Sequence, residues 1–448
     1  MLRHLSSCLV PALLLLGCQA ELCDAASLQA ALDAEGEGGR VRAGDCRIEG
    51  GLRIPPGVTL EGGEETVLAP GAGASIVLQA GSTETALRGL RVEALGGVGV
   101  QLGGEGAAAV EDVVITVDRG VGLVAESVAR LRLTRVSVEG GVDAAAAMTL
   151  PDTATPERGG SYGLWLVDVG TEAAPAELTD VDLRDVGPWG GVVASSQVRW
   201  TGGDVEGVTG TGVLVQGGAV SLDGVRVATL RQGIQLAPAY GLASVDGATL
   251  ETRGVVVTDG EGVGVIHAGG EASHAALSVI GQRRGGVRAQ ADATLRLGEG
   301  SVLSANGLAG VLAVGGSIDV DGLEITGTVL TSALVGEIIR ADVGDGLQLT
   351  GVRGSLASVI VRDNARIGLL IDVGAIGIGA LSLTDVTAGA EGSALGAVAQ
   401  DDAGPLSGWD GAITREGASV ANDAAHAGLL DTVSPADATP PSAPALRP

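Results

Sequence analysis

The stretch of sequence that decides the fold runs from residue 212 to residue 236 and reads GVLVQGGAVSLDGVRVATLRQGIQL. It opens with Gly212 and three aliphatic residues and continues through two short runs in which aliphatic residues alternate with others. A second Gly-aliphatic motif follows at Gly233, 21 residues further on. The runs are separated by Gly-Gly and Asp-Gly pairs, which are typical of tight turns. The pattern therefore predicts short β-strands joined by turns.

The Gly-aliphatic motif recurs along most of the chain, and its shorter spacings cluster near 22 residues. The copies begin at Gly99, Gly122, Gly163, Gly191, Gly212, Gly233, Gly264, Gly286, Gly310, Gly346 and Gly368. Two or three short strands per period would wind the chain into a coil. Parallel stacking of each coil on the next satisfies the backbone hydrogen bonds and buries a narrow aliphatic cylinder. We therefore expect an all-β solenoid of roughly 12 coils over residues 51–400.

The composition agrees with a narrow core. The 448 residues include 76 Gly, no Phe and no Lys, and 45% of them are hydrophobic. Tight corners need the positive φ angles that glycine tolerates, and a thin core has no room for a phenyl ring. A net charge of −27 argues against nucleic acid as a partner. The lack of Lys excludes P-loop and Schiff-base chemistry.

The first residues have the pattern of an export signal. A positively charged end precedes a short apolar run, which closes with Leu15-Leu16-Gly17-Cys18. This motif resembles the lipobox of bacterial lipoproteins, which implies a signal peptide over residues 1–17 and a lipid anchor on Cys18 that binds the protein to a membrane. Because Gln19 and not Asp follows the cysteine, the resemblance implies the outer membrane and leaves the periplasmic or cell-surface side open.

Residues 18–50 are expected to cap the solenoid. A helix over Ala25–Ala34, with Asp24 as its N-cap, is predicted from the apolar spacing. Once Cys18 carries lipid, Cys23 and Cys46 remain in an oxidising compartment, where a disulfide is the simplest pairing. A metal site is the alternative for these two cysteines, but it would lack further ligands nearby.

The repeats resemble the right-handed parallel β-helix of pectate-lyase-like proteins over roughly residues 50–400. The stretch from Cys23 to Gly62 resembles the helix-capped first coil of that superfamily. The resemblance implies the fold and a right-handed coil. It transfers no catalytic motif, because polygalacturonases need Lys beside Asp and His, and no Arg here matches the proton abstractor of pectate lyases.

Departures from the repeat predict loops and ends. Insertions are expected at residues 140–161, 240–254 and 330–345, where they would wall a groove. Residues 401–434 are expected to form a C-terminal cap that includes a helix over Ala418–Leu430, and residues 435–448 form a Pro-rich tail expected to be disordered.

The few aromatic residues give the best candidate for a ligand site. Tyr162, Trp165 and Trp189 fall on neighbouring coils, and Trp165 alternates outward. Exposed rings there would stack on sugars, so we expect a glycan-binding site. The alternative is that the three rings pack beneath the loop at 140–161. Outward-facing Val124, Val193 and Leu214 would extend an apolar stripe beside them, whereas Trp200 aligns with Leu222 and is expected in the core.

Polar residues in the repeats give weaker candidates. Asp180, Asp223, Asp246, Asp321 and Asp385 each follow a strand and are expected to stack at equivalent corners. Such a column could bind Ca²⁺, but Asp at a turn is the simpler interpretation.

The histidines predict no catalytic or metal site. His267 aligns with inward positions and is expected to face the core, and His274 and His426 have no partner that the sequence identifies. No catalytic residue, metal site or cofactor is predicted.

These observations together predict a lipid-anchored envelope protein. Its β-helix would act as a non-enzymatic scaffold or binding surface for glycan or protein. The alternative is a polysaccharide lyase, hydrolase or epimerase with a divergent site.

Overall fold

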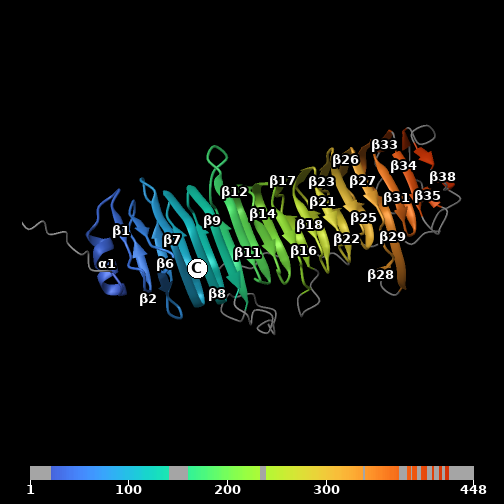
Figure 1. Ribbon diagram of the computed structural model, residues 1–448. Coiled ribbons are helices and arrows are strands. Elements are labelled where there is room, and N and C mark those ends of the chain that lie inside the picture. The colour runs from blue at the N-terminus through green and yellow to red at the C-terminus, as the bar shows by residue number, and fades with distance from the viewer. Residues whose placement is uncertain are drawn as a thin grey trace, which may run out of the picture.

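The computed structural model describes residues 22–140, 160–232, 239–335 and 339–372, and the shorter segments 381–384, 386–390, 395–400, 406–407, 413–415 and 419–422. These residues form one short helix and a long stack of strands (Figure 1). The paired strands are parallel, as in the central coils, except where β28 (Thr331–Val335) pairs antiparallel with β29 (Ile339–Thr350). The predicted right-handed parallel β-helix is confirmed, with about 13 turns against the roughly 12 expected.

One central coil shows the plan of all the others. Its strands are β17 (Thr249–Arg253), β18 (Val256–Thr258) and β19 (Val263–Ala268). In the next coil β20 (Glu271–Ala275), β21 (Ser278–Ile280) and β22 (Gly285–Gln290) stack on them in register. The wall therefore consists of three parallel sheets, which we call sheet 1 (with β19), sheet 2 (with β17) and sheet 3 (with β18).

The remaining strands fall into the same three sheets, and the longest of them pass from one sheet into another. Sheet 1 contains β3 (Leu52–Ile54), β6 (Ile76–Gln79), the ends of β7 (Thr85–Gly103) and β8 (Ala107–Glu126), β10 (Ser161–Val167), the starts of β12 (Trp189–Thr201) and β14 (Thr211–Asp223), β16 (Tyr240–Val245), β25 (Leu308–Val314), β29, β32 (Ile367–Asp372), β35 (Leu395–Gln400) and β38 (Ser419–Asn422).

Sheet 2 contains β1 (Arg40–Arg42), β4 (Thr59–Glu61), the starts of β7, β8, β9 (Arg130–Gly140) and β11 (Ala176–Arg184), the ends of β12 and β14, β23 (Thr294–Leu297), β26 (Ser317–Asp321), β30 (Arg353–Ala357), β33 (Leu381–Thr384) and β36 (Leu406–Ser407). Sheet 3 contains β2 (Arg47–Glu49), β5 (Val67–Ala69), the middles of β7 and β8, the ends of β9 and β11, β13 (Asp204–Glu206), β15 (Arg226–Ala228), β24 (Ser301–Ser304), β27 (Leu323–Thr326), β31 (Ile360–Asn364), β34 (Val386–Ala390) and β37 (Ile413–Arg415).

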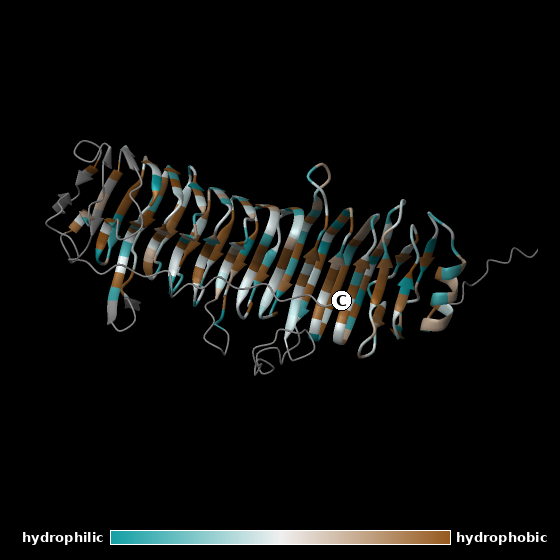
Figure 2. Ribbon diagram, turned by 180° about the vertical axis from the view of Figure 1, so that it is seen from behind, coloured by the Kyte–Doolittle hydropathy of each residue, from teal (hydrophilic) through white to brown (hydrophobic). Residues whose placement is uncertain are grey.

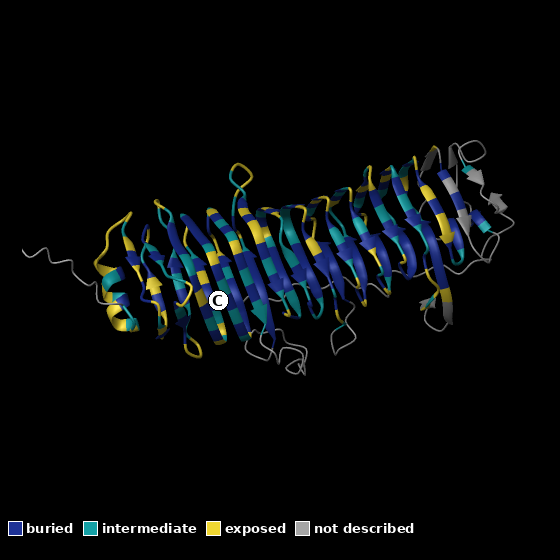
Figure 3. Ribbon diagram, in the orientation of Figure 1, coloured by how far each residue is buried: buried dark blue, intermediate teal, exposed yellow. Residues whose placement is uncertain are grey.

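The lumen is a continuous core of Leu, Val, Ile and Ala (Figures 2 and 3). Leu250, Val257 and Val265, one from each sheet of the same coil, are fully buried. Trp200 lies in the lumen as predicted, also fully buried. Its large ring fits because Gly191 faces it: a Cβ at Gly191 would lie 3.7 Å from Cζ3 of Trp200. The thin core therefore accommodates an indole ring where the neighbouring residue is glycine.

A column of glycines runs through the wall, and its cause differs from the one expected. The column contains Gly99, Gly122, Gly163, Gly190, Gly212, Gly241, Gly264, Gly286, Gly310 and Gly346. At each of them a Cβ would lie only 2.3–2.9 Å from the carbonyl oxygen of the equivalent glycine in the next coil, which for Gly346 is Gly368. The close approach of one coil's backbone to the next, rather than a positive φ, therefore requires glycine at these positions.

This glycine column corrects the repeat assignment at two places. The column passes through Gly190 instead of Gly191, so Val192 faces outward and Val193, expected outside, lies in the lumen. It also passes through Gly241, because β16 and not the motif at Gly233 stacks on β14. Residues 233–238 lie outside the described residues.

The predicted insertions have different outcomes. The prediction at 240–254 is wrong, because this stretch contains β16 and β17. Within the range 330–345, β28 and residues 339–343 of β29 do leave the coil and pair as antiparallel strands (Figure 1), whereas Gly344 and Asp345 already stack on β25. Most of the expected loop at 140–161 lies outside the described residues.

The N-terminal cap has the predicted helix. Helix α1 (Ala25–Ala34) begins at Asp24, whose Oδ1 accepts a hydrogen bond of 2.8 Å from the backbone N–H of Ser27, and this bond lowers the pKa of the Asp24 carboxyl group. Leu28 and Leu32 bury one side of α1 in the core. Cys23 and Cys46 form a disulfide, as predicted.

At the other end, strands β36, β37 and β38 carry the solenoid beyond residue 400. Because Ser419–Asn422 is strand β38, the helix predicted over Ala418–Leu430 is wrong at its start. Residues 423–448, with His426, and the signal region with Cys18 lie outside the described residues. In the part of the chain that the structure describes, no helix is long and apolar enough to cross a bilayer.

Candidate functional site

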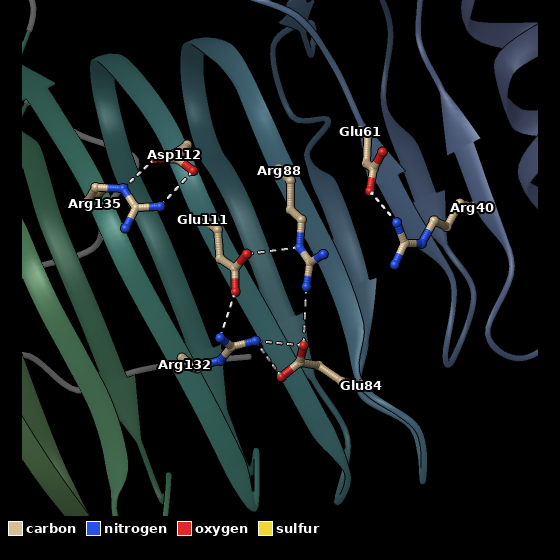
Figure 4. Close-up of polar contacts among 8 residues, drawn as sticks. All are labelled: Arg40, Glu61, Glu84, Arg88, Glu111, Asp112, Arg132 and Arg135. Atoms are coloured by element: carbon tan, nitrogen blue, oxygen red, sulfur yellow. Dashed lines mark hydrogen bonds and ion pairs between the residues drawn. The ribbon is translucent and has the colours of Figure 1, made fainter.

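The outer faces of sheets 2 and 3 carry charges that pair between coils. On sheet 2, Glu111 contacts Arg88 at 3.0 Å and Arg132 at 2.8 Å, and Glu84 closes the ring with contacts of 3.6 and 2.8 Å to the same two arginines (Figure 4). The guanidinium group of Arg135 beside Asp112 lowers the pKa of that carboxyl group. These contacts join β7, β8 and β9 along the outside of the wall.

Sheet 3 continues the same pattern. Arg184 lies 3.2 Å from Asp182 and 3.9 Å from Asp204 of the next coil, and Arg226 lies 3.8 Å from Asp204. Opposite charges in neighbouring coils therefore face each other on both of these sheets, as expected of a solvated solenoid surface.

The outer face of sheet 1 is different, because apolar side chains run along it from coil to coil. Trp165, Val192 and Leu214 are at most 1% exposed, although they point away from the lumen. They belong to clusters that are separate from the lumen core and continue through Ile266, Leu312, Leu370 and Val398. This outer face of sheet 1 is the candidate functional site.

The three predicted aromatic residues do come together on this face. The rings of Tyr162 and Trp189 stack with centroids 5.6 Å apart and planes 14° apart, and Trp165 tilts against Tyr162 at 5.9 Å. The expected exposure holds only for Trp189, which is partly exposed. Tyr162 is 3% and Trp165 1% exposed, so these two rings pack into a cluster with Val121 and Val192. Burial also raises the pKa of the Tyr162 hydroxyl.

The same face carries a polar group that the sequence analysis missed. Arg288 is 3% exposed, and its Nη2 donates a hydrogen bond of 2.6 Å to the carbonyl oxygen of Arg284. Burial raises the pKa of Tyr240 to about 12, while the positive charges of Arg288 and Arg284 act to lower it. One signal was available in the sequence: in the copy that begins at Gly286, an Arg stands where most copies have an aliphatic outward residue.

A buried ion pair lies further along the face. Asp345 is fully buried, and both of its carboxylate oxygens accept hydrogen bonds from Arg366, through Nε at 2.7 Å and through Nη2. Burial raises the pKa of Asp345, and the contact with Arg366 opposes that effect. The two ends of this fork satisfy each other, which is the arrangement that makes a buried carboxylate tolerable.

The predicted column of aspartates does not form. Asp223 is the last residue of a strand of sheet 2, whereas Asp246 follows a strand of sheet 1, so the two lie at different corners. Asp180 aligns with Gly202 rather than with Asp223, as the registers on either side of it show. Asp180 and Asp246 have φ angles of +52° and +55°, values that Asp tolerates at turns.

Asp321, by contrast, pairs with Ala357, and Asp385 is outside the described residues. Among the described residues, no three His, Cys, Asp or Glu side chains converge as a metal site would require. The turn interpretation therefore agrees with the structure better than a Ca²⁺ column does.

The histidines provide one confirmation and one surprise. His267 faces the lumen as predicted and is fully buried, between Ser244 and Ala289 of the neighbouring coils. His274, for which the sequence offered no partner, is 1% exposed and reaches His267 across the lumen, with the two Nε2 atoms 2.9 Å apart. Recurrence at 22 or 23 residues would have pointed to their hydroxyl partners, because Thr252 precedes His274, and Ser244 precedes His267, by one coil.

No protein-family model and no curated protein matches this chain. Solved structures with some likeness include the A-module of the mannuronan C-5 epimerase AlgE6 of Azotobacter vinelandii, at 16% identity and TM-score 0.32 over 89% of this chain and 91% of that chain. Another is the periplasmic alginate epimerase AlgG, at 10% identity and TM-score 0.29 over 89% and 81%. A third is PfbA, a surface adhesin of Streptococcus pneumoniae, at 9% identity and TM-score 0.24 over 88% and 87%.

At these identities and TM-scores, nothing about activity or ligand follows from the three likenesses. The stacked parallel coils of this chain themselves define its class, a right-handed parallel β-helix protein.

Proposed function

We propose that this protein is a non-enzymatic binding scaffold of the cell envelope, and that it binds a glycan at the partly exposed ring of Trp189 on the outer face of sheet 1. The stacked pair of Tyr162 and Trp189 carries the proposal. Trp189 is the partly exposed member of an aromatic cluster on a rigid sheet, and Tyr162 fixes the orientation of its ring. Rigid aromatic rings contribute large contact areas to binding sites at little entropic cost.

The ionisable groups on this face favour binding over catalysis. A general base works best when its pKa lies near the working pH. Tyr162 and Tyr240 have raised pKa values, so their hydroxyl groups stay protonated at neutral pH. The carboxylate of Asp345 is held at both oxygens by Arg366. None of these three groups is therefore available as a general base at neutral pH.

The lipid anchor on Cys18 and export to the envelope remain part of the proposal. The lipobox-like motif supports both. The disulfide between Cys23 and Cys46 also supports export, because disulfides are typical of exported proteins, and Cys23 lies only five residues after Cys18. An anchor there would place the helix-capped end of the solenoid next to the membrane. A Cys18→Ser variant should incorporate no labelled fatty acid and should leave the membrane fraction. If it stays with the membranes, the anchor is elsewhere.

Binding can be tested with a panel of soluble polysaccharides, titrated while tryptophan fluorescence or heat is recorded. Trp189→Ala should weaken binding about tenfold, the loss expected for one aromatic contact. Leu95→Ala is the matched control, because Leu95 is 58% exposed and belongs to β7. The proposal fails if the wild-type protein binds no member of the panel, or if Trp189→Ala binds as tightly as the control.

A carbohydrate-active enzyme is the second candidate, and one observation favours it. The partly exposed Arg284 lies on the same face beside the buried Arg288 and Tyr240, and its guanidinium group could hold a carboxylate of a polyuronate. The assay incubates uronate-containing polysaccharides with the protein, with and without Ca²⁺, and follows unsaturated ends, reducing ends and epimer ratio. Turnover that Arg284→Met abolishes would establish the enzyme and overturn the scaffold.

A further inference from the structure

Four polar side chains form a hydrogen-bonded chain across the largely aliphatic lumen. Oγ of Ser244 lies 2.6 Å from Nδ1 of His267, and Oγ1 of Thr252 lies 2.7 Å from Nδ1 of His274. The two Nε2 atoms meet in the middle at 2.9 Å. The chain joins sheet 1 to sheet 2 and connects the coils of β16 and β17 with those of β19 and β20.

The geometry permits only one arrangement of protons and its reverse. A single proton must lie between the two Nε2 atoms, so the two rings are opposite tautomers. If His267 donates through Nε2, its Nδ1 accepts from Ser244, and the Nδ1–H of His274 donates to Thr252. In the reverse case Thr252 donates to Nδ1 of His274, Nε2–H of His274 donates to His267, and Nδ1–H of His267 donates to Ser244. Each of the three contacts is satisfied in both cases while both rings are neutral.

An extra proton disturbs this arrangement because it places a positive charge among side chains that offer no counter-charge. The first proton can enter at the vacant Nδ1, where the contact with the hydroxyl group reverses and the central bond is kept. Once both rings are charged, both Nε2 atoms carry hydrogen, two N–H groups face each other, and the central bond is lost. The facing side chains are Ser244 and Ala289 beside His267, Thr252 and Leu297 beside His274, and Val257 and Val279 of sheet 3 in the same coils. None of these six side chains is charged or titrates near neutral pH.

We propose that the Ser244–His267–His274–Thr252 chain makes residues 240–297 an acid-labile joint, in which protonation of the histidine pair separates these coils while the rest of the solenoid stays wound. Coils of a solenoid contact only their neighbours, so a local defect can open without unfolding the whole. Acid would therefore open the solenoid first at these coils and not at a random position along it.

The direction of the pH dependence follows from the burial of both rings. Burial lowers the pKa of His274 to about 4, and burial together with the neighbouring ring lowers that of His267 well below its ordinary value. The unfolded coils therefore bind more protons than the folded coils below about pH 6.5, and the joint loses stability as the pH falls from there towards about 4. Carboxylates with lowered pKa, such as Asp112, titrate mainly below that range.

Amide hydrogen exchange, followed by mass spectrometry and corrected for the intrinsic rate at each pH, tests the proposal on the full chain. Between about pH 7 and about pH 4, amides of β16, β17, β19, β20, β22 and β23 should open about 100-fold more often, the change expected for one histidine with these two pKa values. Strands β7, β8 and β9 of the same molecule are the internal control and should stay protected.

Two double variants separate titration from packing. His267→Leu with His274→Leu removes both rings, and His267→Gln with His274→Gln keeps polar side chains that cannot take up a proton. In each variant, protection of residues 240–297 should not change across this pH range. If the leucine pair fails to fold, the glutamine pair decides. The joint is ruled out if the wild-type coils open no earlier than β7–β9, or if either folded variant opens in acid as the wild type does.

Discussion

The polar contacts that cross the coils differ between the two sides of the wall, as two of the networks show. Outside, the ring of Glu84, Arg88, Glu111 and Arg132 joins full opposite charges on side chains that are 17–41% exposed (Figure 4). Inside, the histidine chain joins neutral groups that are at most 5% exposed. Water solvates whatever the outer ring leaves unsatisfied, whereas inside each group must satisfy the next one. A substitution inside the wall should therefore lower the free energy of unfolding more than a substitution outside it.

The largest effect is expected from removing the indole in the lumen. Trp200→Ala should lower the free energy of unfolding by about 4 kcal/mol, because the space opposite Gly191 would become a cavity in a fully buried core. Leu95→Ala, which truncates a 58% exposed residue on the outside, should change it by less than about 0.5 kcal/mol. Urea unfolding followed by circular dichroism gives both values. Equal losses would mean that the lumen is packed no better than the surface.

A smaller effect is expected where a single methyl group is added to the wall. In Gly241→Ala, the new Cβ would lie 2.4 Å from the carbonyl oxygen of Gly264 and 2.5 Å from Cγ1 of Val257, so the coils must separate, at about 3 kcal/mol.

Gly247→Ala, in the tight turn between β16 and β17, is the matched control for this change. Nothing lies within 4 Å of its Cβ, and only its φ of +73° opposes the change, at about 1 kcal/mol. Thermal unfolding of the two variants compares them directly. A Gly241→Ala variant as stable as Gly247→Ala would contradict the steric origin of the glycine column.

The smallest effect is expected outside. Glu111→Gln removes the charge that joins Arg88 to Arg132 and should cost at most about 1 kcal/mol at low salt. The difference should shrink at about 1 M NaCl, where charges are screened over about 3 Å. Unfolding at both salt concentrations measures it. A salt-independent loss would show that Glu111 acts through packing and not through charge.

The sequence predicted the architecture well because a solenoid repeats its rule in every coil. The alternation of Val220 and Leu222 fixes the sides of a strand, and the glycine spacing fixes the period. The exact position of the repeat was harder to predict where two glycines could belong to the glycine column. Gly190 and Gly191 are adjacent, and Gly233 and Gly241 both precede aliphatic residues, so only the stacking of backbones distinguishes them.

The candidate site was less predictable, because periodicity shows which way a side chain points but not what covers it. Trp165 points outward, as alternation requires, and is nevertheless 1% exposed. The contact of His267 with His274 depends on the distance across the lumen between sheets 1 and 2, which no spacing along the chain encodes. Asp345 and Arg366 likewise meet only because the hairpin of β28 and β29 brings β29 back into register with β32.

The stacking of coils also sets the length of the solenoid along its axis. Each turn adds about 4.8 Å along the axis, the spacing of hydrogen-bonded strands. About 13 turns therefore separate the two ends by about 60 Å. If Cys18 is held at a membrane, the last coil stands farthest from it, and a whole turn could be added or removed to change that distance in fixed steps. In that arrangement the number of repeats, rather than any one side chain, would determine how far from the membrane the protein can act.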